Sequence, residues 1–566
     1  MFRAAYFIVF IIGIAPTIPG LAGAILSSFS YIPPIGLAQF SWQGYHLLWL
    51  WNGVGQAIAL TLFSAITSTY IALLFCFSIL QRLWQSRYWK KIETCLSPLL
   101  AMPHVAFAIG FAFLFSPTGM LARSIQTVFD TGINTQGATW LIHDPYALGL
   151  TLALALKEVP FLLLMSIPIL QQLQISRLQQ VSHSLGYSTA QMWWKVILPQ
   201  WLSKMRFALF AVIAYGCSVV DVALILGPNN PATFAVLVWQ WFNDPDLSLL
   251  PRAAAGAMVL FIIATLLLLL VIAIEKAATK VWTQWHYSGR SGINLPGKSI
   301  FNILLLIATL MVPMMIVWSF AHRWRFPDLL PSRWSLRFWE IEWINIVPTI
   351  NESLVLALTT ATIALLLALI AHEYKLKHQL RIPDYVVALP MLIPQLSILF
   401  GLQVTTLYLA ADAYHVWVIW AHVFFAFPYV YLALDGPWKS YNDNFSKAAL
   451  SLGKAPLTVF IQIKARLLLP AILYAWAIGA SVSLAQYLPT LMLGGGRIAT
   501  ITTEAVALSS GFDRRVTAIY AIWQAALPFI FFTFAVLTSR LTQRKFTFIN
   551  KEIVTNDTLS QRPRHL

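Results

Sequence analysis

Charged residues are scarce in this chain. Asp, Glu, Lys and Arg make up 10% of its 566 positions, whereas hydrophobic residues make up 59%. An average soluble domain carries about 25% charged residues. A chain of this length with so little charge has too few polar side chains to cover a water-exposed surface. The composition therefore excludes an ordinary soluble enzyme and predicts an integral membrane protein.

Cysteines and catalytic motifs are also few. The three cysteines, Cys76, Cys95 and Cys217, lie in or beside apolar segments and share no local spacing. They predict neither a disulfide framework nor a zinc site. The sequence contains no HExxH motif, no G-x-S-x-G motif and no paired carboxylates in a plausible soluble cleft. We therefore expect no catalytic residue, no bound metal and no cofactor.

One short stretch does match a catalytic pattern. Residues 292–299, GINLPGKS, fit the G-x-x-x-x-G-K-S pattern of a phosphate-binding loop. A working loop of this kind follows a buried strand, but here a basic polar stretch comes before Gly292 and an apolar run begins at Ile300. Pro296 also lacks a backbone N–H that such a loop uses. We interpret the stretch as a cytoplasmic linker.

Apolar runs predict about twelve membrane-spanning helices, because a helix needs roughly 20 mainly apolar residues to cross a bilayer. The N-terminal run is long enough to span, and we interpret it as an uncleaved first helix rather than a signal peptide. In the first half, the runs lie near residues 7–26, 54–79, 96–116, 146–169, 207–227 and 256–274. In the second half, they lie near residues 300–319, 353–372, 386–409, 416–434, 469–489 and 518–538.

The distribution of positive charge orients these spans. The formal net charge is +16. If the N-terminus is cytoplasmic, the predicted cytoplasmic loops and tails hold 27 Lys and Arg, and the extracytoplasmic loops hold nine. Lys and Arg gather in the cytoplasmic loops of membrane proteins. We therefore expect both termini in the cytoplasm, and the charge gives no reason to expect a nucleic acid partner.

The two halves of the chain resemble each other. Residues 103–110, PHVAFAIG, match residues 394–401, PQLSILFG, and Pro160 and Pro428 interrupt the fourth predicted helix of each half. Because each half has an even number of spans, both halves have the same orientation, with a pathway at their interface. We predict an all-α polytopic fold with a first repeat at 1–280, a linker at 281–299, a second repeat at 300–540 and a cytoplasmic tail at 541–566.

A glycine follows the fourth predicted span of each half. Residues 180–199 read QVSHSLGYSTAQMWWKVILP and residues 447–470 read KAALSLGKAPLTVFIQIKARLLLP, and both contain Ser-Leu-Gly. A glycine just past a helix end readily adopts the left-handed conformation. Ser188 and Gln191 have the spacing of a capping box, and Pro456 suits a first helical turn. We predict a helix–turn–helix corner in each half.

Both stretches resemble the E-A-A-x3-G-x9-I-x-L-P motif of the membrane subunits of ABC importers. Gln180 and Lys447 stand where the family has the acidic first residue, and Ala465-Arg466 replace Leu-Pro in the second copy. Two such halves in one chain resemble the fused permeases of the thiamine and ferric-iron importer group. The residues that carry the resemblance are Gln180, Ser182, Leu185, Gly186 and Pro199, and Lys447, Ala448, Ala449, Leu452 and Gly453.

This resemblance implies a function. The chain would be the permease subunit of an ATP-driven importer in a bacterial inner membrane, surrounded by lipid. Each glycine stretch would be a coupling helix that docks on a separate ATP-binding subunit, with two copies expected. A solute-binding protein outside the membrane would deliver a small-molecule substrate.

Polar side chains inside predicted spans are candidates for the translocation path, because burying an ionisable group in lipid costs roughly 3 kcal/mol or more. Asp221 lies in the fifth predicted helix and Gln486 is its approximate counterpart. The resemblance implies that this region lines the path. His104 and Gln395 follow equivalent prolines and are further candidates. An interhelical hydrogen bond is the alternative role for each.

Lys157 and Glu158 lie in the middle of the fourth predicted span. Adjacent residues do not face each other on a helix, so each needs its own partner inside the bundle. A structural role and a pathway role are both open for this pair.

Two other function classes stay open. A secondary transporter can also have six-plus-six spans, but it needs coupling carboxylates and no docking corners. A membrane-embedded enzyme or an assembly scaffold would show clustered catalytic groups at one interface. The substrate does not follow from the sequence, although Asp221 and the abundant aromatics are compatible with a cation.

Overall fold

The computed structural model describes residues 2–129, 140–287, 291–378, 384–409, 412–511 and 513–560. Within these residues the fold is almost entirely helical, and the sheet is a two-stranded antiparallel ribbon of β1 (Ala321–Arg323) and β2 (Arg333–Trp334). Nine described helices are long and apolar enough to cross a membrane, or up to 12 if each of three bent pairs is one span. The predicted all-α polytopic membrane fold is confirmed.

The described residues of the first half form fifteen α-helical segments, which are numbered in chain order. They are α1 (Phe2–Gly13), α2 (Thr17–Ser28), α3 (Gln43–Leu50), α4 (Val54–Leu83), α5 (Trp89–Ala101), α6 (His104–Phe115), α7 (Met120–Phe129), α8 (Leu148–Gln172), α9 (Ile175–Ser184), α10 (Thr189–Met192), α11 (Leu198–Lys204), α12 (Arg206–Ser218), α13 (Asp221–Leu226), α14 (Phe234–Phe242) and α15 (Leu250–Tyr287).

The second half follows the same plan. Its helices are α16 (Gly297–Phe320), α17 (Arg337–Lys377), α18 (Asp384–Leu392), α19 (Gln395–Leu409), α20 (Tyr414–Ser440), α21 (Asn444–Ser451), α22 (Pro456–Val459), α23 (Ala465–Leu467), α24 (Leu469–Ala485), α25 (Leu488–Gly494), α26 (Ile501–Ser509) and α27 (Arg514–Ser560). Short 3-10 and π segments lie between some of them.

Several helix ends differ from the sequence expectations. α15 continues to Tyr287 and α16 begins at Gly297, so both helices extend into the predicted linker at residues 281–299, of which residues 288–290 lie outside the described residues. α17 begins at Arg337, well before the predicted apolar run. The tryptophan-rich segment before that run is therefore part of the same helix. α27 continues to Ser560, through most of the predicted tail.

The first helix of each half packs against the opposite half. α1 and α2 contact α17, α20 and α19, whereas α16 contacts α4 and α6. The largest cluster of buried hydrophobic residues accordingly contains side chains from both halves, such as Val105 and Ala361. The two halves therefore share one core.

Glycine makes these crossings close. A Cβ on Gly23 of α2 would lie 2.8 Å from the Cα of Gly401 in α19, and a Cβ on Gly401 would lie 1.7 Å from the Gly20 oxygen. In the other crossing, a Cβ on Gly110 of α6 would lie 2.8 Å from the Met311 side chain of α16. Gly110 and Gly401 are the last residues of the two matching Pro-to-Gly stretches of the sequence. At each of these glycines, one half contacts the first helix of the other half.

Predicted spans are broken at equivalent places. In the fifth predicted span, helix α12 ends at Ser218, which lies 32 positions after Gly186. In the eleventh predicted span, helix α24 ends at Ala485, which lies 32 positions after Gly453. The chain then resumes as α13 and α25. The ninth predicted span is bent by 100° between α18 and α19. A proline, Pro394, comes just before α19 and favours the break, because it cannot donate a backbone hydrogen bond.

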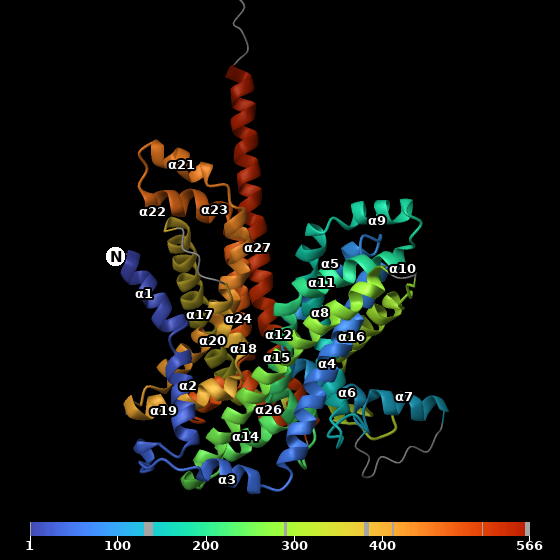
Figure 1. Ribbon diagram of the computed structural model, residues 1–566, viewed down its shortest axis with the longest axis vertical. Helices are drawn as coiled ribbons and strands as arrows, with labels where there is room; N and C mark the ends of the chain where they lie inside the picture. The colour runs from blue at the N-terminus through green and yellow to red at the C-terminus, as the bar shows by residue number, and fades with distance from the viewer. Residues whose placement is uncertain are drawn as a thin grey trace, which may run out of the picture.

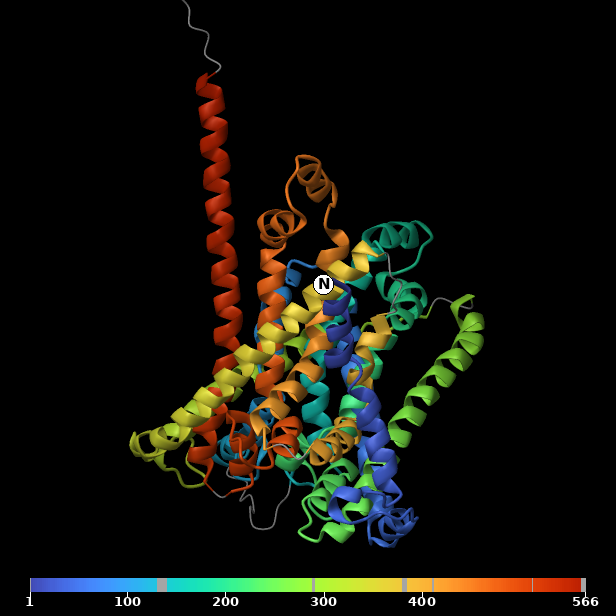
Figure 2. The ribbon, with the colours of Figure 1, turned by 90° about the vertical axis from the view of Figure 1, so that its left-hand side faces the viewer.

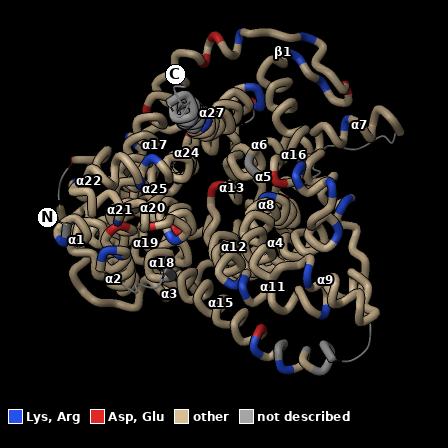
Figure 3. The backbone as a smooth tube through the Cα atoms, turned by 90° about the horizontal axis from the view of Figure 1, so that it is seen from above, with Lys and Arg blue, Asp and Glu red and all other residues tan. Residues whose placement is uncertain are grey.

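The two glycine stretches project from the same end of the molecule. Figure 1 and Figure 2 both show α9 and α10 of the first half at the upper end, together with α21 and α22 of the second half. α3, α14 and α19 lie at the opposite end in Figure 1. Figure 3 looks along the long axis and shows that charged positions are sparse along the helices.

Residues 291–296 form the connection into α16 and pack against the first half. The Gln81 side chain of α4 donates to the Ile293 oxygen at 2.9 Å and accepts from the Leu295 N–H at 2.9 Å. A helix, α15, precedes this stretch in the described residues, and the sheet elsewhere is antiparallel. The stretch therefore lacks the strand–loop–helix setting of a phosphate-binding loop, as the sequence context predicts.

A matched pair of glycine substitutions tests the crossing of α2 and α19. Gly401→Ala should lower the free energy of unfolding by about 1–3 kcal/mol, because the added methyl group overlaps a backbone oxygen. Gly436→Ala in α20 is the control, since a Cβ there meets nothing within 4 Å. Thermal unfolding of the purified protein measures both, and equal transition temperatures would contradict the close crossing.

Candidate functional site

The first glycine corner comprises residues 175–204. α9 ends at Ser184, and Gly186 follows with a left-handed φ of 77°. The Gly186 N–H donates to the His183 oxygen at 3.0 Å and the Tyr187 N–H donates to the Ser182 oxygen at 2.9 Å. This pair of bonds is the Schellman motif, which closes a helix end on a glycine. The turn predicted from the sequence is present.

The capping box predicted after this turn is present as well. The Ser188 hydroxyl accepts the Gln191 N–H at 3.3 Å, and the Gln191 side chain accepts the Ser188 N–H at 2.7 Å. These bonds satisfy backbone donors at the start of α10. The helix then passes through a π segment at Trp193–Ile197 before it continues as α11.

The second glycine corner comprises residues 444–467 and repeats this geometry. Gly453 has a φ of 80°, the Gly453 N–H donates to the Leu450 oxygen at 3.0 Å, and the Lys454 N–H donates to the Ala449 oxygen at 3.3 Å. Pro456 opens α22, as predicted, and a π segment follows at Phe460–Lys464. Both π segments begin seven residues after their glycine.

Each corner presents an apolar side chain at its turn. The side chains of Leu185 and Leu452 are 61% and 82% exposed. Neighbouring apolar residues on the two corners are exposed too, among them Val181 and Leu457. Large exposed apolar side chains that gather at one place mark an interaction surface. The corners therefore each carry a surface suited to a protein partner.

The residues that match the importer motif divide between this surface and the interior. Gln180, Gly186, Lys447, Ala448 and Gly453 are exposed with the two leucines. Ser182 and Ala449 are buried, at 7% and 8% exposed. Lys447 lies 3.5 Å from Asp443 in an exposed ion pair. Pro199 lies in the first turn of α11, after the π segment.

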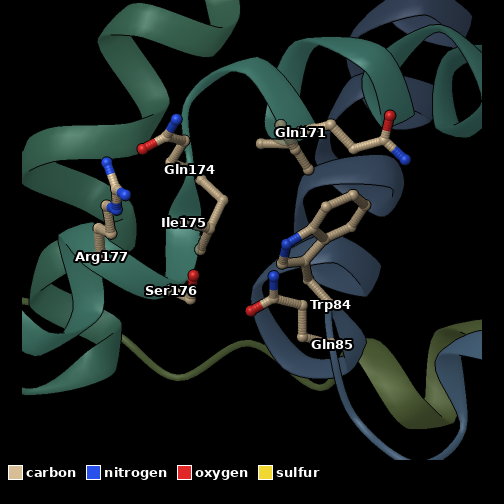
Figure 4. Close-up of a pocket in the computed structure, with 8 residues that line it drawn as sticks. Trp84, Gln85, Gln171, Gln174, Ile175, Ser176 and Arg177 are labelled. Carbon is tan, nitrogen blue, oxygen red and sulfur yellow. The ribbon is translucent and has the colours of Figure 1, made fainter.

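A small cavity lies behind the first corner. It has a volume of about 310 Å³ and is located between the end of α4 and the junction of α8 with α9. Figure 4 shows Trp84 and Gln85 on one side of it and Ile175 and Ser176 on the other. It belongs to the corner and shares no residue with the polar residues of the core.

A polar cluster lies around the break between α12 and α13. His104, the first residue of α6, has its Nε2 atom 3.2 Å from Oε1 of Glu158 in α8. The His104 ring also lies against the Tyr215 ring of α12, with 4.7 Å between the ring centres. His104 thus connects three helices of the first half.

Asp221 belongs to the same cluster. It is the first residue of α13, and its carboxylate accepts the Val222 N–H at 2.9 Å. The helix that Asp221 begins, α13, packs against α6 and α8 of the first half and against α26 of the second half. We call His104, Glu158, Tyr215 and Asp221 the interface cluster.

Gln486 makes contacts of a different kind. It occupies the break between α24 and α25, is 5% exposed and donates to the His422 backbone oxygen at 3.1 Å. The His422 ring in turn lies within hydrogen-bonding distance of Ser483 and Thr490, at 2.9 Å each. The first-half residue that corresponds to Gln486 is Val219. Val219 directly follows the end of α12, as Gln486 directly follows the end of α24. Asp221 comes two residues later.

The remaining candidates are placed differently. The Lys157 ammonium donates to the Leu99 oxygen at 2.9 Å, so it takes a partner other than that of Glu158, as predicted for adjacent residues. Gln395 is the half-buried first residue of α19, and that helix packs on α2. Tyr215 was not a candidate from the sequence, because a single tyrosine in an apolar run carries no local signal.

Comparison with known proteins decides the family. No protein-family model matches the chain. The chain is 32% identical over 493 residues to the inner membrane ABC transporter permease protein YnjC of Escherichia coli (strain K12). The aligned region covers 86% of this chain and 88% of that protein. The chain belongs to the ABC transporter permeases.

The permease is a multi-pass inner membrane protein and a transport subunit rather than an enzyme. Its interface cluster is consistent with this role. Among the residues that the structure describes, no group of three or more His, Cys, Asp and Glu side chains is arranged to hold a metal ion.

Removing the capping box tests how the first corner of the permease is held. Ser188→Ala should raise the exchange rate of the Gln191 amide hydrogen about fivefold, because an N-cap serine contributes about 1 kcal/mol. Ser203→Ala, at an exposed serine of α11, is the control. Hydrogen–deuterium exchange measures both, and an unchanged rate in Ser188→Ala would show that the corner does not depend on this cap.

Proposed function

We propose that the permease is the membrane subunit of an importer and that its two glycine corners are the coupling helices. ATP-driven closure of the attached subunits would move the corners and open the helix bundle toward one side or the other. The observation that carries this proposal is the duplication of one corner geometry at one end of the molecule. Each corner would dock one ATP-binding subunit, which gives two copies per permease.

The exposed leucines support a docking role. Burying a leucine side chain stabilises an interface by about 1.5–3 kcal/mol. Leu185 and Leu452 stand beside the two left-handed glycines, where the tight turn brings the side chain to the tip. Gln180 and Lys447 replace the acidic residue of the importer motif. The proposed contact therefore depends on apolar packing more than on an ion pair.

The orientation follows from the same assignment. The end that carries the corners faces the cytoplasm, together with both termini, which agrees with the excess of Lys and Arg in the loops of that side. The opposite end, with α3 and α14, faces the solute-binding protein. Residues 1–280 and 300–540 are two repeats of one permease unit, as in the fused permeases that the sequence resembles.

A secondary transporter is the competing assignment. It uses no ATP-binding subunit, so it gives no reason for two corners with matching turns and exposed leucines. The relationship to an ABC permease also does not favour it.

Substitution of the two leucines tests the docking proposal. Leu185→Asp combined with Leu452→Asp should lower the recovery of the co-purified ATP-binding subunit by at least about tenfold, because two buried apolar contacts become buried charges. Each single variant should leave one of the two copies bound. Affinity purification of the tagged permease followed by quantification of the bound subunit measures this.

The matched control is Leu330→Asp, since Leu330 is 65% exposed and lies in the loop between β1 and β2, outside both corners. Full recovery of the ATP-binding subunit with the double variant would refute the assignment of the corners. Equal loss with Leu330→Asp would show that the effect is not specific to them.

A further inference from the structure

We propose that the β1–β2 ribbon and the start of α17 form a binding surface for the headgroup of an anionic phospholipid in the outer leaflet. The choice of leaflet rests on the proposed orientation, and the rest of the inference is independent of the proposed coupling function. The surface consists of exposed arginines and tryptophans in the segment that joins α16 to α17. We call the following six residues the ribbon surface: Arg323, Arg325, Arg333, Trp334, Arg337 and Trp343.

The ribbon lies where the chain leaves the membrane. α16 is a candidate membrane span of 24 residues that ends at Phe320, and β1 begins at the next residue. Near its start, Phe301 of α16 belongs to the same buried cluster as Trp193 of the first corner. A helix of this length spans about 36 Å, so the ribbon stands at the opposite end of the molecule from the corners. Figure 3 shows β1 at the outer rim of the molecule.

The ribbon places two arginines opposite each other. Arg323 of β1 and Arg333 of β2 are cross-strand partners, and both side chains are exposed. Such partners have Cβ atoms about 4.5–5.5 Å apart on one face, and like charges there destabilise the strand pair. The backbone holds this register, since the Ser332 N–H donates to the Arg323 oxygen at 2.9 Å. An anion between the two guanidinium groups would remove the repulsion.

The protein itself supplies no such anion within the described residues. None of the four arginines of the ribbon surface forms an ion pair there with a carboxylate. Three carboxylates occur in the same segment, Asp328, Glu340 and Glu342, and that of Glu342 accepts from the Asn345 side chain at 3.3 Å. Arginine binds phosphate oxygens through two parallel N–H groups. The ribbon surface therefore suits a phosphate group.

The tryptophans indicate that this phosphate belongs to a lipid. Trp334 and Trp343 are 54% and 53% exposed. Tryptophan gathers at the level of the lipid headgroups, where its amphipathic ring meets both the acyl chains and water. α17 has 41 residues, so it is about 61 Å long, about twice the thickness of the hydrocarbon core. Its first turns, which carry Trp343, therefore reach the headgroup region.

The position at the rim favours a lipid over the other macromolecule expected at this end. A solute-binding protein has to deliver its substrate to the pathway between the two halves, whereas lipid surrounds the rim. The exposed side chains of Leu336 and Ile344, at 58% and 77%, extend the apolar part of the same segment. Arginines beside exposed apolar side chains match a phospholipid, which joins a charged headgroup to acyl chains.

Lipid binding to the full chain, purified in detergent without any ATP-binding subunit, tests this proposal. The probe is dioleoylphosphatidylglycerol, and the control lipid is dioleoylphosphatidylcholine, which has the same acyl chains and no net charge. Phosphatidylglycerol should raise the unfolding temperature with a saturable concentration dependence, and by more than phosphatidylcholine does. Arg323→Gln combined with Arg333→Gln should weaken the affinity for phosphatidylglycerol at least about tenfold, the equivalent of 1.4 kcal/mol.

Two comparisons separate binding from a structural role. Arg87→Gln combined with Arg177→Gln removes the same charge from two exposed arginines elsewhere. This control should keep the affinity within about threefold, because charges more than about 10 Å apart are largely screened. In phosphatidylcholine, the Arg323→Gln and Arg333→Gln variant should unfold at the same temperature as the parent chain or higher, because a like-charge pair is removed. A fall of equal size in both lipids would show a structural role and overturn the proposal.

Other outcomes also overturn it. They are equal stabilisation by the two lipids, unchanged affinity for phosphatidylglycerol in the Arg323→Gln and Arg333→Gln variant, and equal stabilisation by inorganic phosphate, which would indicate a site for a free anion. Loss of a bound solute-binding protein in that variant, with lipid affinity unchanged, would assign the surface to that protein. Because no ATP-binding subunit is present, the lipid results do not depend on docking at Leu185 and Leu452.

Discussion

The close crossing of backbones at Gly23 and Gly401 is the contact on which the arrangement of the two halves depends. It lets α2 lie directly on α19, and the crossing of α16 with α6 at Gly110 is its counterpart. Each half is thereby held by the first helix of the other. Because packed helices shift as units rather than deform, the movement that we propose for the corners would be transmitted across one shared core.

The corners were predictable from the sequence because their structure is local. A left-handed glycine, a serine cap three residues before a glutamine and a proline in the first turn determine the backbone without help from distant residues. The interface cluster was not predictable in the same way. Asp221 and His104 were visible as polar residues in apolar runs, but the contacts of His104 with Glu158 and Tyr215 depend on how α6, α8 and α12 pack.

Because the two halves are joined in one chain, their sequences can differ. They do differ in the core of the permease. The first half contributes Glu158 and Asp221 to the interface, whereas the corresponding region of the second half has His422 in hydrogen bonds with Ser483 and Thr490. A symmetric dimer would place two copies of each carboxylate near the axis, with the repulsion that like charges cause.

The central claim is that ATP moves the two corners relative to each other. Spin labels at Leu185→Cys and Leu452→Cys would report the distance between the two corners by pulsed electron paramagnetic resonance. The chain would also carry Cys95→Ala to prevent labelling at that site, whereas Cys76 and Cys217 are buried. With the ATP-binding subunits present, the distance distribution should shift to shorter values when ATP and vanadate are added. An identical distribution with and without nucleotide would contradict the account.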